Sequence, residues 1–283
     1  MSLNPLVDSR DVRFVLFEML GLDKINRFEH FAGFDKSVFE DTLQLAEKIA
    51  MAHFYPTNAE GDKIGLKYDP KTCDVKVPEI FHAGYKAFIE AGYHTLAISQ
   101  EAGGMGMPIA LSFSSMEYFN AGNTSLGMYC SAIPGAAGLL INFGSDELKA
   151  KYLPKLLEGE WGGTMCLTEP SAGSDVGALK SKAVKQADGS YLITGQKIFI
   201  SNGEHDMSTN MIHPVLARIE GDPEGTKGIS IFIVPKFLVN DDGSLGERND
   251  MACAGVEHKM GLHGNATSTL NFGENGKCKG WLL

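Results

Sequence analysis

The sequence predicts a multidomain α+β protein, with an N-terminal all-α helical domain over residues 1–160 and an antiparallel β-barrel-like domain over residues 161–283. Apolar residues recur at spacings of three and four up to about residue 160, as they do in helices packed on a core. From Trp161 onward they alternate in short runs between turn residues, which is typical of barrels and sandwiches. The length of 283 residues fits one large domain or two ordinary ones.

The helical half contains recognisable starts and stops. Asp35 and Ser145 are residue types that favour helix N-caps, and Gly92 and Gly159 follow runs of helical spacing as C-terminal stops. The expected helices cover residues 35–53, 78–91 and 148–157, with two more within 109–143 that are separated by a break near Gly127.

The second half contains strand and turn signals. Asp188 and Gly189 stand between two alternating runs, and this pattern predicts a hairpin with a tight turn. Further strands are expected at residues 215–219, 229–234 and 266–272.

Charge and cysteine content exclude several classes of function. Acidic residues outnumber basic ones by 35 to 25, so the formal net charge is −10. A general nucleic-acid-binding protein needs a clustered basic face, so no nucleic-acid partner is predicted. Five cysteines without a CxxC pair argue against a disulfide framework or a structural zinc site and favour a reducing compartment. We therefore expect a cytoplasmic protein.

Neither a membrane span nor a metal site is predicted. The chain opens without a basic, apolar signal peptide. Its longest apolar stretch, residues 132–143, has 12 residues and contains Pro134, which is too short to cross a bilayer. The histidines show no ligand spacing and are expected to be solvated or to cap helices; those considered are His205, His213, His258 and His263.

The strongest motif covers residues 165–175. A strand is expected to run into Pro170, and the small residues that follow would let backbone N–H groups approach an anion closely. Chemistry alone leaves two interpretations open, a polar turn or a phosphate-binding turn. Fingerprints of the GxGxxG, GxxxxGK[ST] and HExxH types are absent from the sequence.

Two motifs together resemble the acyl-CoA dehydrogenase family. Residues 166–175 read CLTEPSAGSD, and residues 195–203, some twenty positions later, read GQKIFISNG. Shorter matches flank them at residues 101–106, 144–154 and 259–261. The chain is most similar to the methylmercaptopropionyl-CoA dehydrogenase-like branch, through residues 4–6, 13–18 and 127–129.

The resemblance implies a fold and a reaction. Family members have an N-terminal helical domain, a middle β domain that binds FAD, and a C-terminal helical bundle. They remove two hydrogens across the α,β-bond of an acyl-CoA thioester, with hydride passing to N5 of FAD. A glutamate on the bundle takes the α-proton. Because this chain stops where the bundle would begin, we expect a fragment that lacks the catalytic glutamate, is inactive and holds FAD weakly.

The resemblance also implies roles for individual residues. Thr168 matches a position near the polar edge of the flavin ring, and Ser201 one whose hydroxyl approaches N5. Phe199 matches an aromatic position, often tryptophan, that packs on the isoalloxazine; without the resemblance it could equally be a core aromatic. Glu169 matches a structural position, so no catalytic residue is expected in this chain. The cofactor-binding residues implied are Met165, Leu167, Thr168, Gly173, Ser174, Phe199, Ile200 and Ser201, and the substrate-binding residues are Ser174 and Tyr129.

Partners and alternatives follow from the same resemblance. The implied substrate is an acyl-CoA, the implied electron acceptor is electron-transferring flavoprotein or a similar protein, and the full-length protein is expected to be a homo-oligomer. The alternatives are an acyl-CoA oxidase, a nitroalkane oxidase, a DNA-associated member of the family, or a flavin- or CoA-binding module without enzymatic activity.

Overall fold

The structure is a computed structural model that describes residues 4–283. Two compact units pack separately: the first contains the chain up to Ile64 together with Pro78–Ser131, and the second contains Gly65–Val77 and Ala132–Leu283. Secondary structure changes from helices to strands at the predicted place, because the last helix ends at Leu157 and the first barrel strand begins at Trp161. The two compact units divide the chain at other points, so the domain boundary at residue 160 stays a prediction.

The helices follow the predicted pattern closely. Asp35 caps the helix after it, accepting hydrogen bonds from the N–H groups of Ser37 and Val38, and Ser145 accepts one from Leu148. The helices of the structure are α1 (Ser9–Arg13), α2 (Lys36–Ile49), α3 (Asn58–Ile64), α4 (His82–Glu90), α5 (Ile109–Gly122), α6 (Thr124–Phe143) and α7 (Asp146–Leu157).

The expected break near Gly127 is wrong. The chain leaves helical geometry at Asn123, which is extended and whose side chain caps α6 by accepting a hydrogen bond from the Leu126 N–H. Gly127 is helical and serves packing instead. A Cβ at this position would lie 2.3 Å from Oδ1 of Asn120 on α5, so glycine is needed for the close approach of the two helices.

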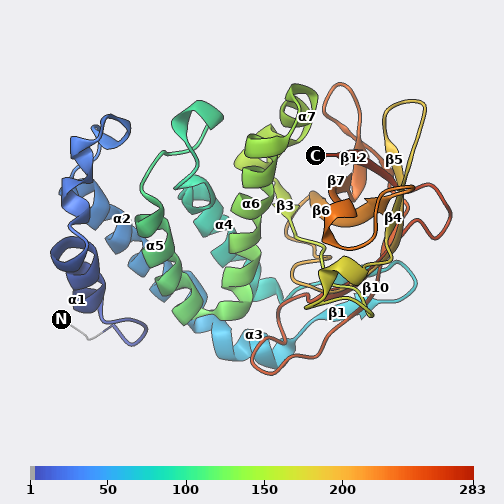
Figure 1. The fold of residues 1–283 in the computed structure, drawn as a ribbon. Helices are drawn as coiled ribbons and strands as arrows, with labels where there is room; N and C mark the ends of the chain where they lie inside the picture. Colours follow the sequence, from blue (N-terminus) through green and yellow to red (C-terminus); the bar gives the residue numbers. More distant parts are fainter. Residues whose placement is uncertain (1–3) are drawn as a thin grey trace. The chain divides into compact units, whose positions relative to one another are not determined.

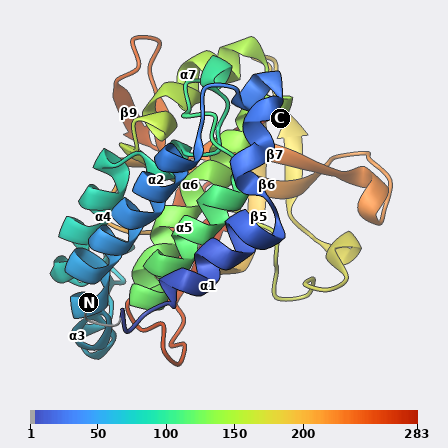
Figure 2. The same cartoon turned by 90° about the vertical axis from the view of Figure 1, so that its left-hand side faces the viewer.

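The core of the helical unit is aromatic. The Phe119 ring lies 5.0 Å from each of the rings of Phe54, Phe88 and Tyr93. These residues come from α5, α4 and the segments that follow α2 and α4, and all four are buried. Figures 1 and 2 show α2 and α5 side by side around this core.

The second unit is built on a closed barrel, which confirms the predicted fold class. The ring runs β4–β5–β12–β7–β6 and closes because β4 also pairs with β6. All of these pairs are antiparallel except β4 with β6. The barrel strands are β4 (Lys182–Lys185), β5 (Tyr191–Ile200), β6 (Asn210–Ile219), β7 (Ile229–Pro235) and β12 (Lys279–Leu282) (Figure 1).

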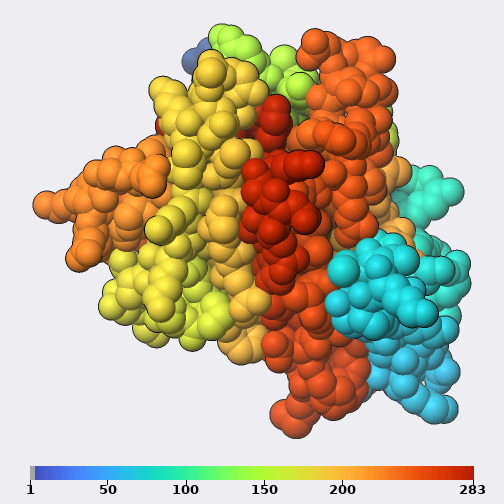
Figure 3. Space-filling view, turned by 90° about the vertical axis from the view of Figure 1, so that its right-hand side faces the viewer, coloured from blue at the N-terminus to red at the C-terminus, as the bar shows by residue number. Residues whose placement is uncertain are grey.

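Other strands extend this barrel. Strand β3 (Trp161–Gly163) pairs in parallel with β6, and β10 (Met251–Val256) and β11 (Ser268–Phe272) continue from the second half of β5. Strands β8 (Phe237–Val239) and β9 (Leu245–Arg248) form a separate hairpin. In Figure 3 the loop between β6 and β7 stands out at the edge of the visible face of this unit.

The barrel strands bury aromatic and aliphatic side chains. Phe232 packs 5.0 Å from Tyr191, and the registers place it opposite Val215. A Cβ on Gly280 would lie 2.9 Å from both Ile193 and Val234, so glycine lets β12 close the ring. The predicted hairpin at Asp188 and Gly189 joins β4 to β5.

A hairpin that the sequence analysis did not foresee belongs to the barrel unit. Strands β1 (Lys67–Asp69) and β2 (Asp74–Lys76) lie between helices in the sequence, so residues 1–160 are not entirely helical. The Tyr68 hydroxyl donates to the Cys253 carbonyl at 2.9 Å, and Arg248 pairs with Asp74 at 3.0 Å. The Val77 N–H donates to the Asp206 carboxylate at 3.1 Å. These bonds attach the hairpin to β9, to β10 and to the loop before β6.

Helix α6 is longer than the apolar stretch that the sequence analysis considered. It has 20 residues, and an 18-residue window of it has a mean hydropathy of 1.4, which meets the length and composition of a membrane span. Within the protein, 44% of that window is buried. The argument from a 12-residue stretch is therefore wrong for this helix. Core helices meet the same two criteria, so the lack of a span stays a prediction.

Candidate functional site

The two motifs that carry the resemblance lie side by side. Residues 165–168 continue from β3 as an extended segment, in which the Cys166 N–H donates to the Pro214 carbonyl at 2.8 Å. On its other side the Ile198 N–H of β5 donates to the Thr168 carbonyl at 2.8 Å. The first motif is therefore held between β6 and β5, directly beside the second.

The paired segments expose apolar side chains and hydroxyl groups. Met165 is 41% exposed and Phe199 is 54% exposed, whereas Cys166 between the strands is fully buried. Leu167, Thr168 and Ser201 are half-buried. Within residues 4–283, the hydroxyls of Thr168 and Ser201 make no hydrogen bond.

A β-bulge turns Phe199 outward. The register between β5 and β11 shifts between Ser268 and Leu270, and Phe199 has a φ of 58°. Side chains of a regular strand alternate between faces, so Phe199 would share the inward face of Lys197. Because of the extra residue, Lys197 and Ile200 are buried while Phe199 is exposed. The left-handed conformation of a non-glycine residue costs about 1–2 kcal/mol, which the surrounding pairing must offset.

A buried ion pair ties the two motifs together. Lys197 Nζ lies 2.7 Å from Oε1 of Glu169 and also donates to the Leu167 carbonyl at 3.2 Å. The Glu169 carboxylate accepts two further hydrogen bonds, from the N–H groups of Lys180 at 2.6 Å and Ser181 at 3.1 Å. Lys197 is 0% exposed and Glu169 is 4% exposed.

These bonds leave Glu169 unsuited to proton abstraction. Burial raises its pKa, but the hydrogen bonds from Lys197, Ser181 and Lys180 outweigh burial and hold the pKa below its usual value. The carboxylate is therefore ionised and already saturated with donors. This geometry supports the structural role expected of Glu169.

The turn within the first motif is open and exposed. Glu169 and Ala172 exchange backbone hydrogen bonds at 2.8 and 3.1 Å, which closes the turn over Pro170. Gly173 and Ser174 follow on the surface. A Cβ added to Gly173 would meet only Thr168 Cγ2, at 3.6 Å, so there is space beside this backbone.

Two other predicted residues are buried. Ile200 is 2% exposed and points into the barrel unit, so only its backbone is available to a ligand. Tyr129 is also 2% exposed and belongs to the helical unit. Its role in substrate binding stays a prediction.

A polar cluster inside the barrel unit was missed. His213, expected to be solvated or capping, is instead fully buried on β6, and its Nδ1 lies 2.9 Å from the Thr164 hydroxyl. Burial, with a smaller effect of the Lys236 charge, lowers the pKa of His213 to about 3. Alternation in β6 could not have indicated this position, because the strand is buried without interruption around His213. The signal in the sequence was the apolar run on both sides of this histidine.

A second missed feature is Lys197 itself. The signal was present, because a lysine beside Ile198, Phe199 and Ile200 in a strand needs a buried partner. Only the fold identifies that partner as Glu169, 28 positions earlier in the chain.

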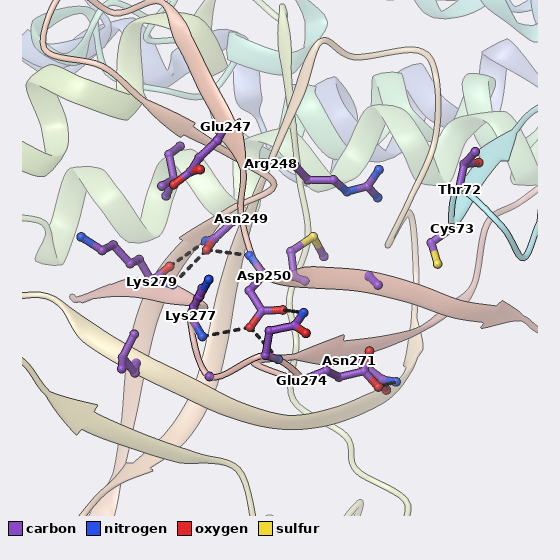
Figure 4. Close-up of a pocket in the computed structure, with 16 residues that line it drawn as sticks. Thr72, Cys73, Glu247, Arg248, Asn249, Asp250, Asn271, Glu274, Lys277 and Lys279 are labelled. Carbon is purple, nitrogen blue, oxygen red and sulfur yellow. Dashed lines mark hydrogen bonds between the residues drawn. The ribbon is translucent and has the colours of Figure 1, made fainter.

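A cavity of about 710 Å³ lies elsewhere in the barrel unit and shares no residue with the predicted site. Figure 4 shows its polar lining, with Thr72 and Cys73 on one side and Lys277 and Lys279 on the other. Asp250 accepts hydrogen bonds from the N–H groups of Asn275 and Lys277 at 2.9 Å each, and Arg248 is paired with Asp74. The acidic and basic groups of the cavity balance each other and are largely paired, so they favour no ligand class.

Among the described residues, no cluster of three or more metal-ligating side chains is present.

The paired motifs fit a flat aromatic cofactor with polar edges. Phe199 and Met165 offer an exposed apolar surface, and the unbonded hydroxyls of Thr168 and Ser201 can donate to or accept from ring heteroatoms. The open backbone at Gly173 admits a close-lying anionic group. These are the features that a flavin dinucleotide requires of one wall of its site.

Comparisons with known sequences point to one family. Residues 66–160 match the profile described as acyl-CoA dehydrogenase, N-terminal domain, and residues 164–274 match acyl-CoA dehydrogenase, middle domain. The chain is 43% identical over 277 residues to the broad-specificity linear acyl-CoA dehydrogenase FadE5 of Mycobacterium tuberculosis, covering 97% of this chain and 45% of that protein. It is 39% identical to a butyryl-CoA dehydrogenase of Syntrophomonas wolfei, covering 99% of this chain and 46% of the relative.

The methylmercaptopropionyl-CoA dehydrogenase-like relationship is also found. The 3-methylmercaptopropionyl-CoA dehydrogenase of Ruegeria pomeroyi is 35% identical over 263 residues, covering 93% of this chain and 44% of that protein. FadE5 and the butyryl-CoA dehydrogenase are more similar in sequence. The chain thus spans less than half the length of these curated relatives.

Solved structures share the fold. Butyryl-CoA dehydrogenase from Megasphaera elsdenii superimposes with a TM-score of 0.65 and 26% identity, covering 86% of this chain and 56% of that one. A chain from work on the electron transferring flavoprotein of Acidaminococcus fermentans gives a TM-score of 0.65 and 28% identity, covering 85% of this chain and 55% of that one. With both domain profiles matched in order and the barrel closed as predicted, this chain belongs to the acyl-CoA dehydrogenase family.

Proposed function

We propose that the chain forms part of an FAD-dependent acyl-CoA dehydrogenase, an oxidoreductase acting on CH–CH bonds. FAD, when bound, would supply the acceptor for a hydride from the β-carbon of an acyl-CoA thioester. The observation that carries the proposal is the Ile198 N–H to Thr168 carbonyl bond, at 2.8 Å. It places the exposed Phe199 beside the hydroxyl-bearing segment of the first motif.

Each predicted residue has a task in this proposal. Phe199 packs against the flat face of the ring, and Met165 and Leu167 extend the apolar surface. The hydroxyls of Thr168 and Ser201 hold the polar edge of the ring. The backbone of Ile200, and the small residues Gly173 and Ser174, lie against the rest of the cofactor, with Ser174 and Tyr129 also binding substrate.

No carboxylate of this chain is assigned as catalytic base. Glu169 is the carboxylate closest in sequence to the site, and three donors already occupy it. Proposed partners are an acyl-CoA substrate and electron-transferring flavoprotein as acceptor, with a homo-oligomeric full-length protein in the cytoplasm. The names of the relatives, which include butyryl-CoA and broad-specificity linear acyl-CoA dehydrogenases, support the acyl-CoA class of substrate.

The experiment is a titration of the chain with FAD up to millimolar concentration, followed by quenching of flavin fluorescence. Saturable binding is expected, and Phe199→Ala should weaken it by about tenfold through loss of the stacking surface. Leu245→Ala is the matched control, because Leu245 is an exposed apolar residue of β9 outside both motifs. Failure of the wild-type chain to bind FAD, or equal losses in the two variants, would refute the proposed site.

A further inference from the structure

The Glu169–Lys197 ion pair joins three separate pieces of chain at one buried point. Lys197 belongs to β5, Glu169 to the middle of the first motif, and the N–H groups that also bind Glu169 belong to Lys180 and Ser181, just before β4. The Leu167 carbonyl accepts a further bond from the same ammonium group. Every one of these contacts crosses between segments that are far apart in sequence.

The pair is also adjacent to the residues that face the proposed cofactor. Glu169 directly follows Thr168, and Lys197 stands two positions before Phe199. The Ile198 N–H to Thr168 carbonyl bond lies between these positions. Any change in the separation of the Glu169 and Lys197 backbones therefore changes the separation of the two motif segments that form the proposed site.

The bulge at Phe199 needs such an anchor. Its φ of 58° is unfavourable, and the chain could relax by returning to regular alternation. With Ile200 kept inward, regular alternation would turn the Lys197 side chain outward, away from its buried partner. Beyond the bulge, Ile200 is held by its pairing with Ser268 and by the Gly203 N–H, which donates to the Ile200 carbonyl at 3.2 Å. The ion pair supplies the fixed point on the other side.

We propose that Glu169 and Lys197 are positioning residues that hold the two motif segments of the cofactor site at a fixed separation and maintain the bulge at Phe199. The inference rests on the proposed function for its consequence in FAD binding, but not for its consequence in the backbone. An ion pair with a purely structural role would contribute only to the free energy of unfolding. An ion pair with a positioning role also changes FAD binding and the exposure of the Ile198 amide, by amounts that the change in the free energy of unfolding does not explain.

The discriminating variant is the double substitution Glu169→Gln with Lys197→Met. The introduced amide oxygen can still accept from one of the two backbone N–H groups, that of Lys180 or that of Ser181, and the methionine fills the volume of the lysine stem without charge. Replacing both partners of a buried ion pair by neutral groups of similar size is often close to neutral for stability. The cross-link between the segments is nevertheless lost, since a thioether cannot donate to the amide oxygen or to the Leu167 carbonyl.

Three quantities are measured in the full chain: stability from urea unfolding, the dissociation constant for FAD from fluorescence quenching, and hydrogen exchange of the Ile198 amide by NMR. Glu169→Gln and Lys197→Met should each reduce stability, weaken FAD by about tenfold or more and speed Ile198 exchange by about tenfold or more. The double variant should recover stability, whereas its weaker FAD binding and its faster Ile198 exchange should persist.

The matched control is the second buried ion pair of the barrel unit, Glu204 with Lys236. Glu204→Gln with Lys236→Met should leave the FAD dissociation constant and Ile198 exchange within about twofold of the wild type. If the double variant at positions 169 and 197 recovers all three quantities together, or if Ile198 exchange is unchanged in every variant, the positioning role is wrong. If the wild-type chain binds no FAD, the proposed function fails, and the Ile198 exchange rates still decide this inference.

Discussion

Lowering the pH should destabilise the barrel unit through His213. This histidine is fully buried, and its neighbours are the Thr164 hydroxyl, the Cys166 thiol, the Phe272 ring and, at longer range, the Lys236 ammonium. None of these groups stabilises an imidazolium ion, and Lys236 opposes it. Burial therefore lowers the pKa of His213 from 6.5 to about 3.

The direction of the pH effect on stability follows from proton uptake by the folded and the unfolded protein. Below about pH 6.5 the unfolded chain binds a proton at His213, whereas the folded protein does not bind it until about pH 3. Stability is therefore highest above pH 6.5 and falls as the pH drops toward 3. Integration gives a loss of about 2 kcal/mol between pH 7 and pH 5, and about 5 kcal/mol once the pH is below 3.

The assay is urea unfolding followed by tryptophan fluorescence at pH 7, 6 and 5. Both tryptophans of the chain, Trp161 and Trp281, lie in the same unit as His213, so the signal reports on that unit. His213→Asn is the comparison, because its side-chain oxygen can still accept from Thr164 but does not titrate. Other groups titrate equally in both proteins and cancel in the difference. Parallel stability curves for the two proteins between pH 7 and pH 5 would refute the reasoning.

Four further substitutions test the packing of the barrel unit by the same fluorescence assay. Gly195→Ala should lower the free energy of unfolding by about 3 kcal/mol or more, because the added Cβ would lie 2.2 Å from Ser181 Oγ at a φ of 155°. Its control, Gly189→Ala, has a φ of 84° and open space around it, so it should lower that free energy by only about 1–2 kcal/mol. Equal losses in the two variants would contradict the clash. Tyr152→Phe should leave stability unchanged or raise it by up to about 1 kcal/mol, since the buried hydroxyl of Tyr152 has no partner among the described residues. A clear loss of stability in this variant would reveal a bond to that hydroxyl. Lys197→Met should lower the free energy of unfolding by about 3–5 kcal/mol, because it leaves Glu169 buried without its cation. A loss below about 1 kcal/mol would show that the Glu169–Lys197 pair is dispensable for stability.

Local patterns in the sequence were sufficient for most elements. Asp35 and Ser145 act as N-caps where expected, and the turn at Gly189 closes the predicted hairpin. These features depend on a few neighbouring residues, since caps and tight turns are stabilised by bonds within three or four positions. The resemblance to acyl-CoA dehydrogenases rested in the same way on two short motifs, and the two domain profiles confirm it.

Features that depend on distant contacts were predicted less well. The β1–β2 hairpin has too few residues to show a pattern, and it is stable because Tyr68 and Asp74 bind residues almost two hundred positions later. The break at Asn123 was misplaced because Gly127 suggests a helix stop in sequence but serves a close helix contact in space.

For the site, the sequence by itself determined which residue types are present and that the two motifs belong together. Only the tertiary structure decided which side chains are accessible. The alternation of a regular strand would turn Phe199 inward, and the bulge opposite β11 turns it outward while burying Ile200. The pairing of Glu169 with Lys197 was likewise decided by the closing of the barrel, since two charges 28 positions apart can meet without water only where packed strands exclude it.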